Sequence, residues 1–183
     1  MKKSGWKIIL GVAVLVCVIC LGRFGWVKYQ DYKTEQARKA TLKEIASTEF
    51  TGENEGKEPE KVPAGVKHGQ KINFKKLIKI NSDIYAWIYV PGTRIDYPVA
   101  QSQESDDHYL KYNFKNEPEF AGCIYTEKAN KKDFSDPNTL FYGHNMRNGS
   151  MFQNLHKFED EAFFKKHKEV YVYTPKKTYT YTI

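Results

Sequence analysis

The stretch TLFYGHNMRNGSMFQNLHKF, Thr139 to Phe158, carries the strongest structural signals in the sequence. Its first part, Thr139 to Tyr142, is apolar and aromatic and predicts a β-strand. Ser150 is followed three residues later by Gln153, the pattern of a capping box. We therefore expect a helix to begin at Ser150 and to continue to His167, with a polar turn between it and the strand.

His144 is the histidine best placed for catalysis, because it follows the apolar strand and a glycine and precedes the polar turn. A side chain at the end of a strand stands on a rigid support from which it can reach a groove. An imidazole can exchange protons with a nucleophile and a leaving group near neutral pH. The alternative is a hydrogen-bonded histidine with only a structural role.

The flanking residues predict a folded domain over 71–183 that is built from short strands and helices. Asn73 can cap a helix that carries Phe74 and Leu77, and a second short helix is expected from Ser82 to Trp87. Strands are expected at 88–90, 94–99, 122–126, 169–174 and 178–183, and one or two helical turns at 104–110. This mixed order, in which short strands dominate, predicts a mainly β fold, a barrel or sandwich with peripheral helices.

The N-terminus predicts a membrane anchor over residues 1–26. Residues 8–22 contain no charge, and Trp6 and Trp26 flank them at a helical separation of about 30 Å. No small-x-small cleavage site follows, which favours an uncleaved signal anchor that contacts the membrane through residues 6–26 over a cleaved signal peptide. The cluster of Lys2, Lys3 and Lys7 before the span predicts a single-pass protein of the cell membrane with a cytoplasmic N-terminus and an extracellular domain.

Two further segments separate this anchor from the domain. Residues 27–50 are rich in Gln, Ala, Lys and Glu and predict a polar juxtamembrane helix. Residues 51–70 are dense in Gly, Pro and charged residues, which is typical of a linker.

Charge, cysteines and motifs exclude several classes of function. The formal charge is +7, but residues 27–183 hold 25 basic and 22 acidic side chains, a net charge of only +3, so no nucleic-acid partner is expected. Cys17 and Cys20 lie in the apolar run and leave Cys123 alone, so no disulfide framework is expected. Phosphate-binding loops, zinc-binding helices and calcium loops are missing from the sequence, and we expect neither cofactor nor metal.

Three segments, in consistent order, resemble the class B sortases. The stretch from Thr139 to Phe158 looks like the histidine-bearing signature of that family. YAWIYVPGTRIDYPVAQ, Tyr85 to Gln101, resembles its first strands, and AGCIYTEKAN, Ala121 to Asn130, resembles the block that follows. The resemblance implies a sortase-type β-barrel with peripheral helices, C-terminally incomplete and preceded by an N-terminal transmembrane helix.

Sortases are extracellular cysteine transpeptidases of mainly Gram-positive bacteria. The resemblance therefore implies cleavage of a C-terminal sorting signal and attachment of surface proteins to a peptidoglycan cross-bridge amine. The family uses a cysteine nucleophile, a histidine acid/base and an arginine that stabilises the oxyanion. His144 takes the position of the histidine, and Tyr142 and Leu110 match residues of the substrate groove. Asp106 falls where an asparagine is usual, and a carboxylate cannot donate a hydrogen bond as an amide does.

One part of the family pattern is missing from the 183 residues. The nucleophile of the family lies well after the histidine in a Thr-Leu-x-Thr-Cys strand, with the arginine on the next strand, and the sequence reaches Ile183 without either. Cys123 matches an earlier strand, where a small residue is usual, and a lone cysteine is more often a small buried hydrophobe than a nucleophile. We expect a chain that is catalytically incomplete by itself. The alternatives are a membrane-anchored pseudo-sortase that binds peptides without turnover and a structural module of the cell wall.

Overall fold

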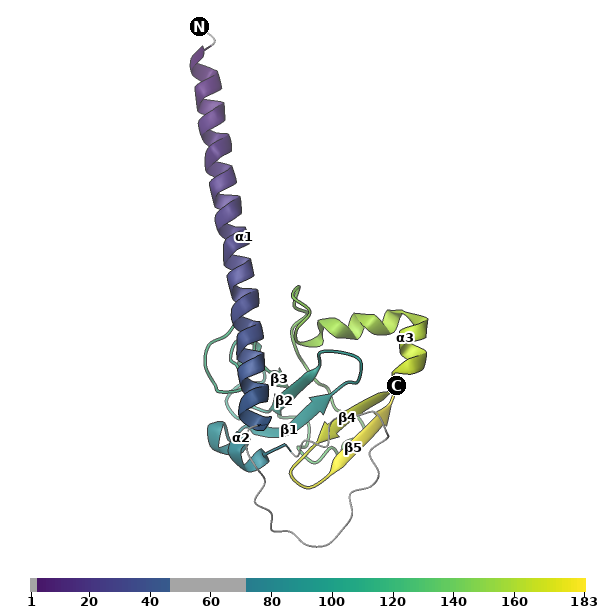
Figure 1. The fold of residues 1–183 in the computed structure, drawn as a ribbon. Helices are drawn as coiled ribbons and strands as arrows, with labels where there is room; N and C mark the ends of the chain where they lie inside the picture. The colour runs from purple at the N-terminus through teal and green to yellow at the C-terminus, as the bar shows by residue number, and fades with distance from the viewer. Residues whose placement is uncertain (1–2, 47–71) are drawn as a thin grey trace. The chain divides into compact units, whose positions relative to one another are not determined.

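The computed structural model describes residues 3–46 and 72–183 (Figure 1). The predicted linker over 51–70 and the last residues of the predicted juxtamembrane helix lie outside the described residues. The chain forms two units, Met1–Lys39 and Ala40–Ile183.

The N-terminal unit belongs to one helix, α1 (Lys3–Ala46), which contains both the apolar run and the described part of the polar segment after it. Within α1, the stretch Trp6–Ala37 is long and apolar enough to cross a membrane. Large apolar side chains such as Ile8, Leu15 and Leu21 are exposed on it. A helix that is apolar on all sides buries these groups in lipid or in a protein core.

The domain is built on a mixed five-stranded sheet with the order β3-β2-β1-β4-β5. All neighbouring strands are antiparallel except β2 and β3, which are parallel. The sheet does not close on itself within the described residues, so β3 and β5 are its edges. The strands are β1 (Ile84–Tyr89), β2 (Asp96–Ala100), β3 (Ile124–Tyr125), β4 (Glu169–Tyr173) and β5 (Thr178–Thr182).

The predicted helix over Ser82–Trp87 is wrong, because most of that segment belongs to β1, the central strand. Residues 84–88 are all buried, since β1 pairs with β2 on one side and β4 on the other. A strand buried on both faces has a continuous apolar run instead of an alternating pattern, and such a run is easily confused with a short helix. The predicted strand pair around Pro91-Gly92 is confirmed, with Ile88 opposite Tyr97.

The short helices agree with the sequence in part. Helix α2 (Phe74–Ile80) is confirmed, and the Asn73 side chain accepts a hydrogen bond from the Lys76 N–H at 2.9 Å. The expected helical turn within 104–110 is the 3-10 helix η1 (His108–Leu110). The predicted strand at 139–142 makes only an isolated bridge, between Tyr142 and Tyr125.

The predicted continuous helix from Ser150 to His167 is wrong. It is divided into a 3-10 helix, η2 (Phe152–Glu159), and a short α-helix, α3 (Glu161–Lys166), whose N-cap is Asp160. Ser150 does not act as a cap: η2 has no side-chain cap hydrogen bond, and Asn148 Oδ1 accepts from both the N–H and the hydroxyl of Ser150, at 3.0 and 2.6 Å. The next residue, Met151, adopts a left-handed conformation with φ 53°. A local side-chain bond therefore replaces the capping box.

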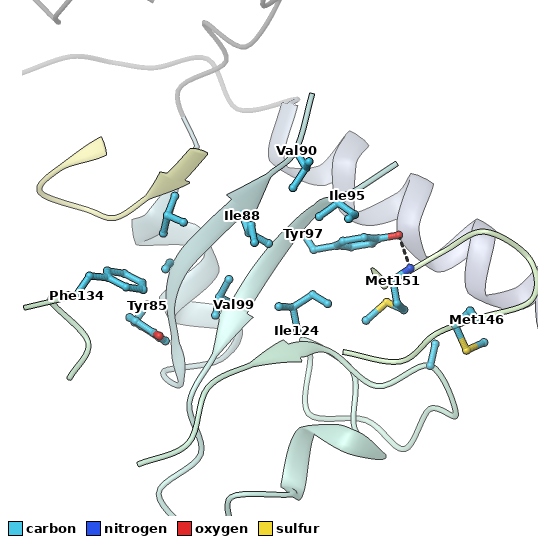
Figure 2. Close-up of a cluster of buried hydrophobic side chains, with 13 residues drawn as sticks. Tyr85, Ile88, Val90, Ile95, Tyr97, Val99, Ile124, Phe134, Met146 and Met151 are labelled. Carbon is cyan, nitrogen blue, oxygen red and sulfur yellow. Dashed lines mark hydrogen bonds between the residues drawn. The ribbon is translucent and has the colours of Figure 1, made fainter. Parts of the chain in front are cut away.

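The main core lies against β1 and β2 and extends to the loop that follows His144 (Figure 2). Met146 and Met151, from that loop, are buried in this cluster. The Tyr97 hydroxyl, on β2, accepts a hydrogen bond from the Met151 N–H at 3.0 Å, drawn as the dashed line in Figure 2. The core thus fixes the chain on the C-terminal side of the candidate catalytic histidine. A second cluster contains Leu77, Ile84, Trp87, Ala100, Tyr109, Phe114, Cys123 and Tyr125.

Candidate functional site

The segment that carries His144 is held against β3 on its N-terminal side. Tyr142 and Tyr125 exchange two backbone hydrogen bonds, of 2.8 and 3.0 Å. At Gly143 a Cβ atom would lie 2.9 Å from Cδ2 of Phe152 and closer still to the Ile124 side chain. A glycine is therefore needed for this close approach. His144 follows at once, and its carbonyl accepts from the Phe152 N–H at 3.0 Å.

The His144 imidazole is oriented by a backbone carbonyl. Its Nε2 atom lies 2.8 Å from the Leu110 oxygen. A carbonyl can only accept, so Nε2 carries the proton and the neutral ring presents Nδ1 as its proton acceptor. No hydrogen-bond partner of Nδ1 is found in the described part of the chain. The exposed ring of Phe120 lies 5.6 Å from the imidazole, centroid to centroid, and borders the same site.

Tyr142 and Leu110, both predicted from the resemblance, lie beside His144. Tyr142 precedes it by two residues and stacks on Tyr125 with a centroid distance of 5.3 Å. A hydrogen bond to Glu127, and then burial, raise the pKa of the Tyr142 hydroxyl above its ordinary value. Leu110 contributes its carbonyl and a side chain that is 36% exposed. Leu110 thus contacts the imidazole directly, while the ring of Tyr142, two residues before His144, packs on Tyr125.

Asp106 lies near Tyr142 but is occupied by a different contact. Its carboxylate accepts a hydrogen bond from the Lys128 N–H at 2.8 Å, which connects it to the loop after β3. Its negative charge also contributes to the raised pKa of Tyr142, after the larger effects of Glu127 and burial. The carboxylate acts here as an acceptor, which a family asparagine could also do, but it has no proton to donate.

Several residues that support the site were not predicted. The Arg94 guanidinium donates to the Asn148 carbonyl at 2.9 Å, and the Arg94 N–H donates to Asn154 Oδ1 at 2.9 Å. These bonds attach the β1–β2 turn to the loop after His144. The Asn145 amide donates to His156 Nε2 at 3.1 Å, so His156 Nδ1 is protonated and donates to Glu159 at 2.7 Å. A single sequence carries no signal for such distant pairs.

Cys123 is a buried thiol and is not part of the exposed surface around His144. Only 5% of the residue is exposed, and its Sγ atom lies 3.6 Å from the Pro98 carbonyl. Burial raises the pKa of the thiol to about 12, so it is neutral at physiological pH. A nucleophilic cysteine needs the opposite, an accessible thiolate. The other two cysteines, Cys17 and Cys20, lie in α1. The residues described contain no group of three side chains that could hold a metal ion.

The family model of the sortase domain matches residues 88–183. The sortase B of Listeria monocytogenes is 34% identical over 140 residues, which are 76% of this chain and 50% of that protein. The chain belongs to the class B sortase family. It spans about half the length of the curated relatives that it matches, since the sortase B of Staphylococcus aureus is covered to 42% at 36% identity.

Solved structures agree with this assignment. A complex of Bacillus anthracis sortase B with the compound AAEK1 has a TM-score of 0.65 at 32% identity, covering 84% of this chain and 67% of the other. A complex of Staphylococcus aureus sortase B with a substrate has a TM-score of 0.56 at 32% identity, covering 60% of this chain and 50% of the other. The predicted sortase fold and family are confirmed.

Proposed function

We propose that this class B sortase chain supplies the acid/base histidine and part of the peptide groove of a cysteine transpeptidase. The reaction is cleavage of a C-terminal sorting signal and transfer of the surface protein to a peptidoglycan cross-bridge amine. The observation that carries the proposal is the His144 imidazole, whose Nε2–H is held by the Leu110 carbonyl at 2.8 Å while Nδ1 is left to exchange protons.

His144 acts in both halves of the transfer. Its neutral ring takes the proton of a thiol, and the thiolate attacks the scissile carbonyl of the peptide. The imidazolium then gives this proton to the departing amine as the thioester forms. In the second half His144 accepts the proton of the incoming amine, which attacks the thioester; the thiolate leaves and regains its proton from the imidazolium. The hydrogen bond at Nε2 is compatible with both charge states of the ring, because Nε2 remains protonated throughout.

The sorting-signal peptide is proposed to lie against Tyr142, Leu110 and Phe120. The Leu110 carbonyl and the exposed Phe120 ring lie against the imidazole, and Asp106 supplies a negative charge near Tyr142. Concave, mostly apolar surfaces with a few polar groups are typical of ligand sites. Helix α1 is proposed to anchor the protein in the cell membrane, with Lys2 and Lys3 in the cytoplasm and the domain on the extracellular face.

Residues 1–183 by themselves are proposed to bind such peptides without turnover. The observation that favours this second activity is the burial of Cys123, which leaves the described domain without an accessible thiol. An isotope-edited NMR titration with sorting-signal peptides should perturb Tyr142 and Leu110, whereas a cleavage assay should give no product. Turnover that disappears in Cys123→Ala would contradict this proposal.

A chimaera tests the catalytic role of His144. In it, residues 1–183 are joined to the part of the Listeria monocytogenes sortase B that they do not match. We expect thiol-dependent peptide cleavage that falls by about 10²- to 10⁴-fold in His144→Ala, because proton transfer is lost while packing is kept. The matched control is His167→Ala, since His167 packs against Phe163 with a centroid distance of 4.4 Å and does not contact Leu110. Near-normal rates in His144→Ala would reject the proposed role.

A further inference from the structure

A buried polar network lies beneath the 3-10 helix that presents the Leu110 carbonyl. Only 1% of Tyr109 is exposed. Its hydroxyl accepts from Asn81 Nδ2 at 2.7 Å and donates to Asp83 Oδ2 at 2.9 Å. Burial raises the pKa of this hydroxyl, and the carboxylate of Asp83 raises it further, so the hydroxyl keeps its proton and remains a donor.

The partners of Tyr109 are themselves fixed in place at the junction of α2 and β1. The second proton of Asn81 Nδ2 is donated to the Phe114 carbonyl at 3.0 Å. Asn81 Oδ1 accepts from the Asp83 N–H at 3.0 Å, and the Asn81 N–H donates to the Leu77 carbonyl at 2.9 Å as the end of α2. The hydroxyl of Tyr109 thus meets a donor, Asn81, whose side chain makes three hydrogen bonds, and an acceptor, Asp83, whose N–H is bonded to that same side chain.

The main chain of Tyr109 is held from a second direction, by the block before β3. Its carbonyl accepts from the Cys123 N–H at 2.9 Å. Gly122 adopts φ +62°, and a Cβ atom there would lie 2.9 Å from the Leu110 oxygen and closer still to the Tyr109 oxygen. With its side chain bound to one element and its carbonyl to another, Tyr109 cannot rotate. The carbonyl of the next residue, Leu110, is thereby aimed at His144.

We propose that Tyr109 is a positioning residue that selects the tautomer of His144 through the Leu110 carbonyl. A neutral imidazole exists in two tautomers, and the acceptor near one nitrogen decides which of them dominates. A three-residue 3-10 helix has weak hydrogen bonds of its own and would not hold that acceptor firmly. The buried hydroxyl of Tyr109 supplies the missing rigidity. The catalytic value of this arrangement rests on the proton-transfer role proposed above for His144.

The test uses the full 183-residue chain in detergent micelles with isotope-labelled histidine. Long-range proton–nitrogen correlation spectra, recorded where the ring is neutral, report which nitrogen of His144 is protonated, and His144→Gln assigns its signals. In the unaltered protein Nε2 should be protonated and Nδ1 should not. In Tyr109→Phe the two nitrogen shifts should move toward each other, because the tautomers mix. The control Tyr112→Phe removes the hydroxyl of a tyrosine that stacks on His108, and its His144 signals should stay in place.

Two outcomes would overturn the proposal. In the first, Tyr109→Phe is folded and its His144 nitrogen shifts are unchanged. In the second, Tyr112→Phe moves the His144 shifts as far as Tyr109→Phe does. If Tyr109→Phe does not fold, Asp83→Asn decides, since it keeps an acceptor oxygen but removes the charge. In Asp83→Asn, movement of the two His144 nitrogen shifts toward each other supports the proposal, and an unchanged spectrum rejects it. The spectra report the tautomer of His144 without a nucleophilic thiol or a peptide substrate. Their result therefore does not depend on the outcome of the chimaera assay. Activity that survives His144→Ala would instead remove the catalytic role.

Discussion

Replacing Gly122 by alanine should destabilise the domain and displace the carbonyl that orients His144. Gly122 combines a left-handed backbone, φ +62°, with carbonyl groups in the space that a Cβ atom would occupy. Gly149 is a matched control, because it has φ +80° but its nearest neighbour is the end of the Arg94 side chain, 3.3 Å from a built Cβ. Both substitutions introduce backbone strain, and only Gly122→Ala adds a collision with rigid main chain.

The magnitudes follow from these two contributions. The left-handed conformation costs an alanine about 1 to 2 kcal/mol relative to glycine. Overpacking against atoms that cannot rotate away adds about 1 to 3 kcal/mol. We therefore expect Gly149→Ala to lower the free energy of unfolding by about 1 to 2 kcal/mol and Gly122→Ala by about 2 to 5 kcal/mol. The second value is a large part of the total stability of a small domain, which is about 5 to 15 kcal/mol.

The free energy of unfolding of both variants is measured by urea unfolding of the 183-residue chain in micelles. Far- and near-ultraviolet circular dichroism follow the transition. At sub-denaturing urea, the Nε2 proton of His144 should also lose its hydrogen-bonded shift in Gly122→Ala and keep it in Gly149→Ala. Equal losses of stability in the two variants would refute the collision with the Tyr109 and Leu110 carbonyls. An unmoved His144 signal in a destabilised Gly122→Ala would refute the connection between this turn and the imidazole.

Three further predictions concern chemistry and association. In a Cys17→Ala, Cys20→Ala background, Cys123 should resist alkylation at pH 8 until urea is added, because burial raises its pKa to about 12; rapid labelling of folded protein would contradict this. Burial also raises the pKa of Tyr85 to about 12 from its ordinary value near 10. As the pH rises, the unfolded chain therefore loses this proton before the folded chain does, and the free energy of unfolding should fall between about pH 10 and 12. Tyr85→Phe should flatten that fall in alkaline titrations, and an equal slope would exclude Tyr85 as a cause. Finally, β5 is a sheet edge and Tyr181 on it is 43% exposed, so Tyr181→Lys should reduce association in sedimentation experiments, whereas an unchanged distribution would show that this edge does not pair.

The parts of the fold that were predictable have local causes. The cap at Asn73 and the alternating segments of β4 and β5 are set by neighbours in the sequence, and the structure confirms them. Strand β1 was mistaken for a helix because its pairing with two distant strands, and not its own pattern, determines its conformation. Ser150 does not cap a helix, because Asn148 holds its N–H and hydroxyl in a local turn and the next residue, Met151, is left-handed.

The candidate site shows the same division between local and distant causes. His144 could be singled out from its place after an apolar segment, and the resemblance added Tyr142 and Leu110. Their roles remain proposals: the structure brings the Leu110 carbonyl to the His144 ring, whereas Tyr142, two residues before His144, stacks on Tyr125. The network of Tyr109, Asn81 and Asp83 was not predicted. Tyr109 lies 28 residues after Asn81 and 26 after Asp83, and nothing in one sequence indicates that such distant residues meet.

Three described elements contact His144 or its segment and orient the ring. Its segment is fixed by β3 on one side, through Tyr142 and Gly143, and by the Tyr97 hydroxyl on the other side, through Met151. Its ring is fixed by a carbonyl from a third element, η1. None of these contacts involves a cysteine thiol or a bound peptide substrate. An acid/base group held in this way is preorganised, so little of the binding energy of a substrate is needed to orient it. The imidazole should therefore have the same orientation in the 183-residue chain and in the chimaera.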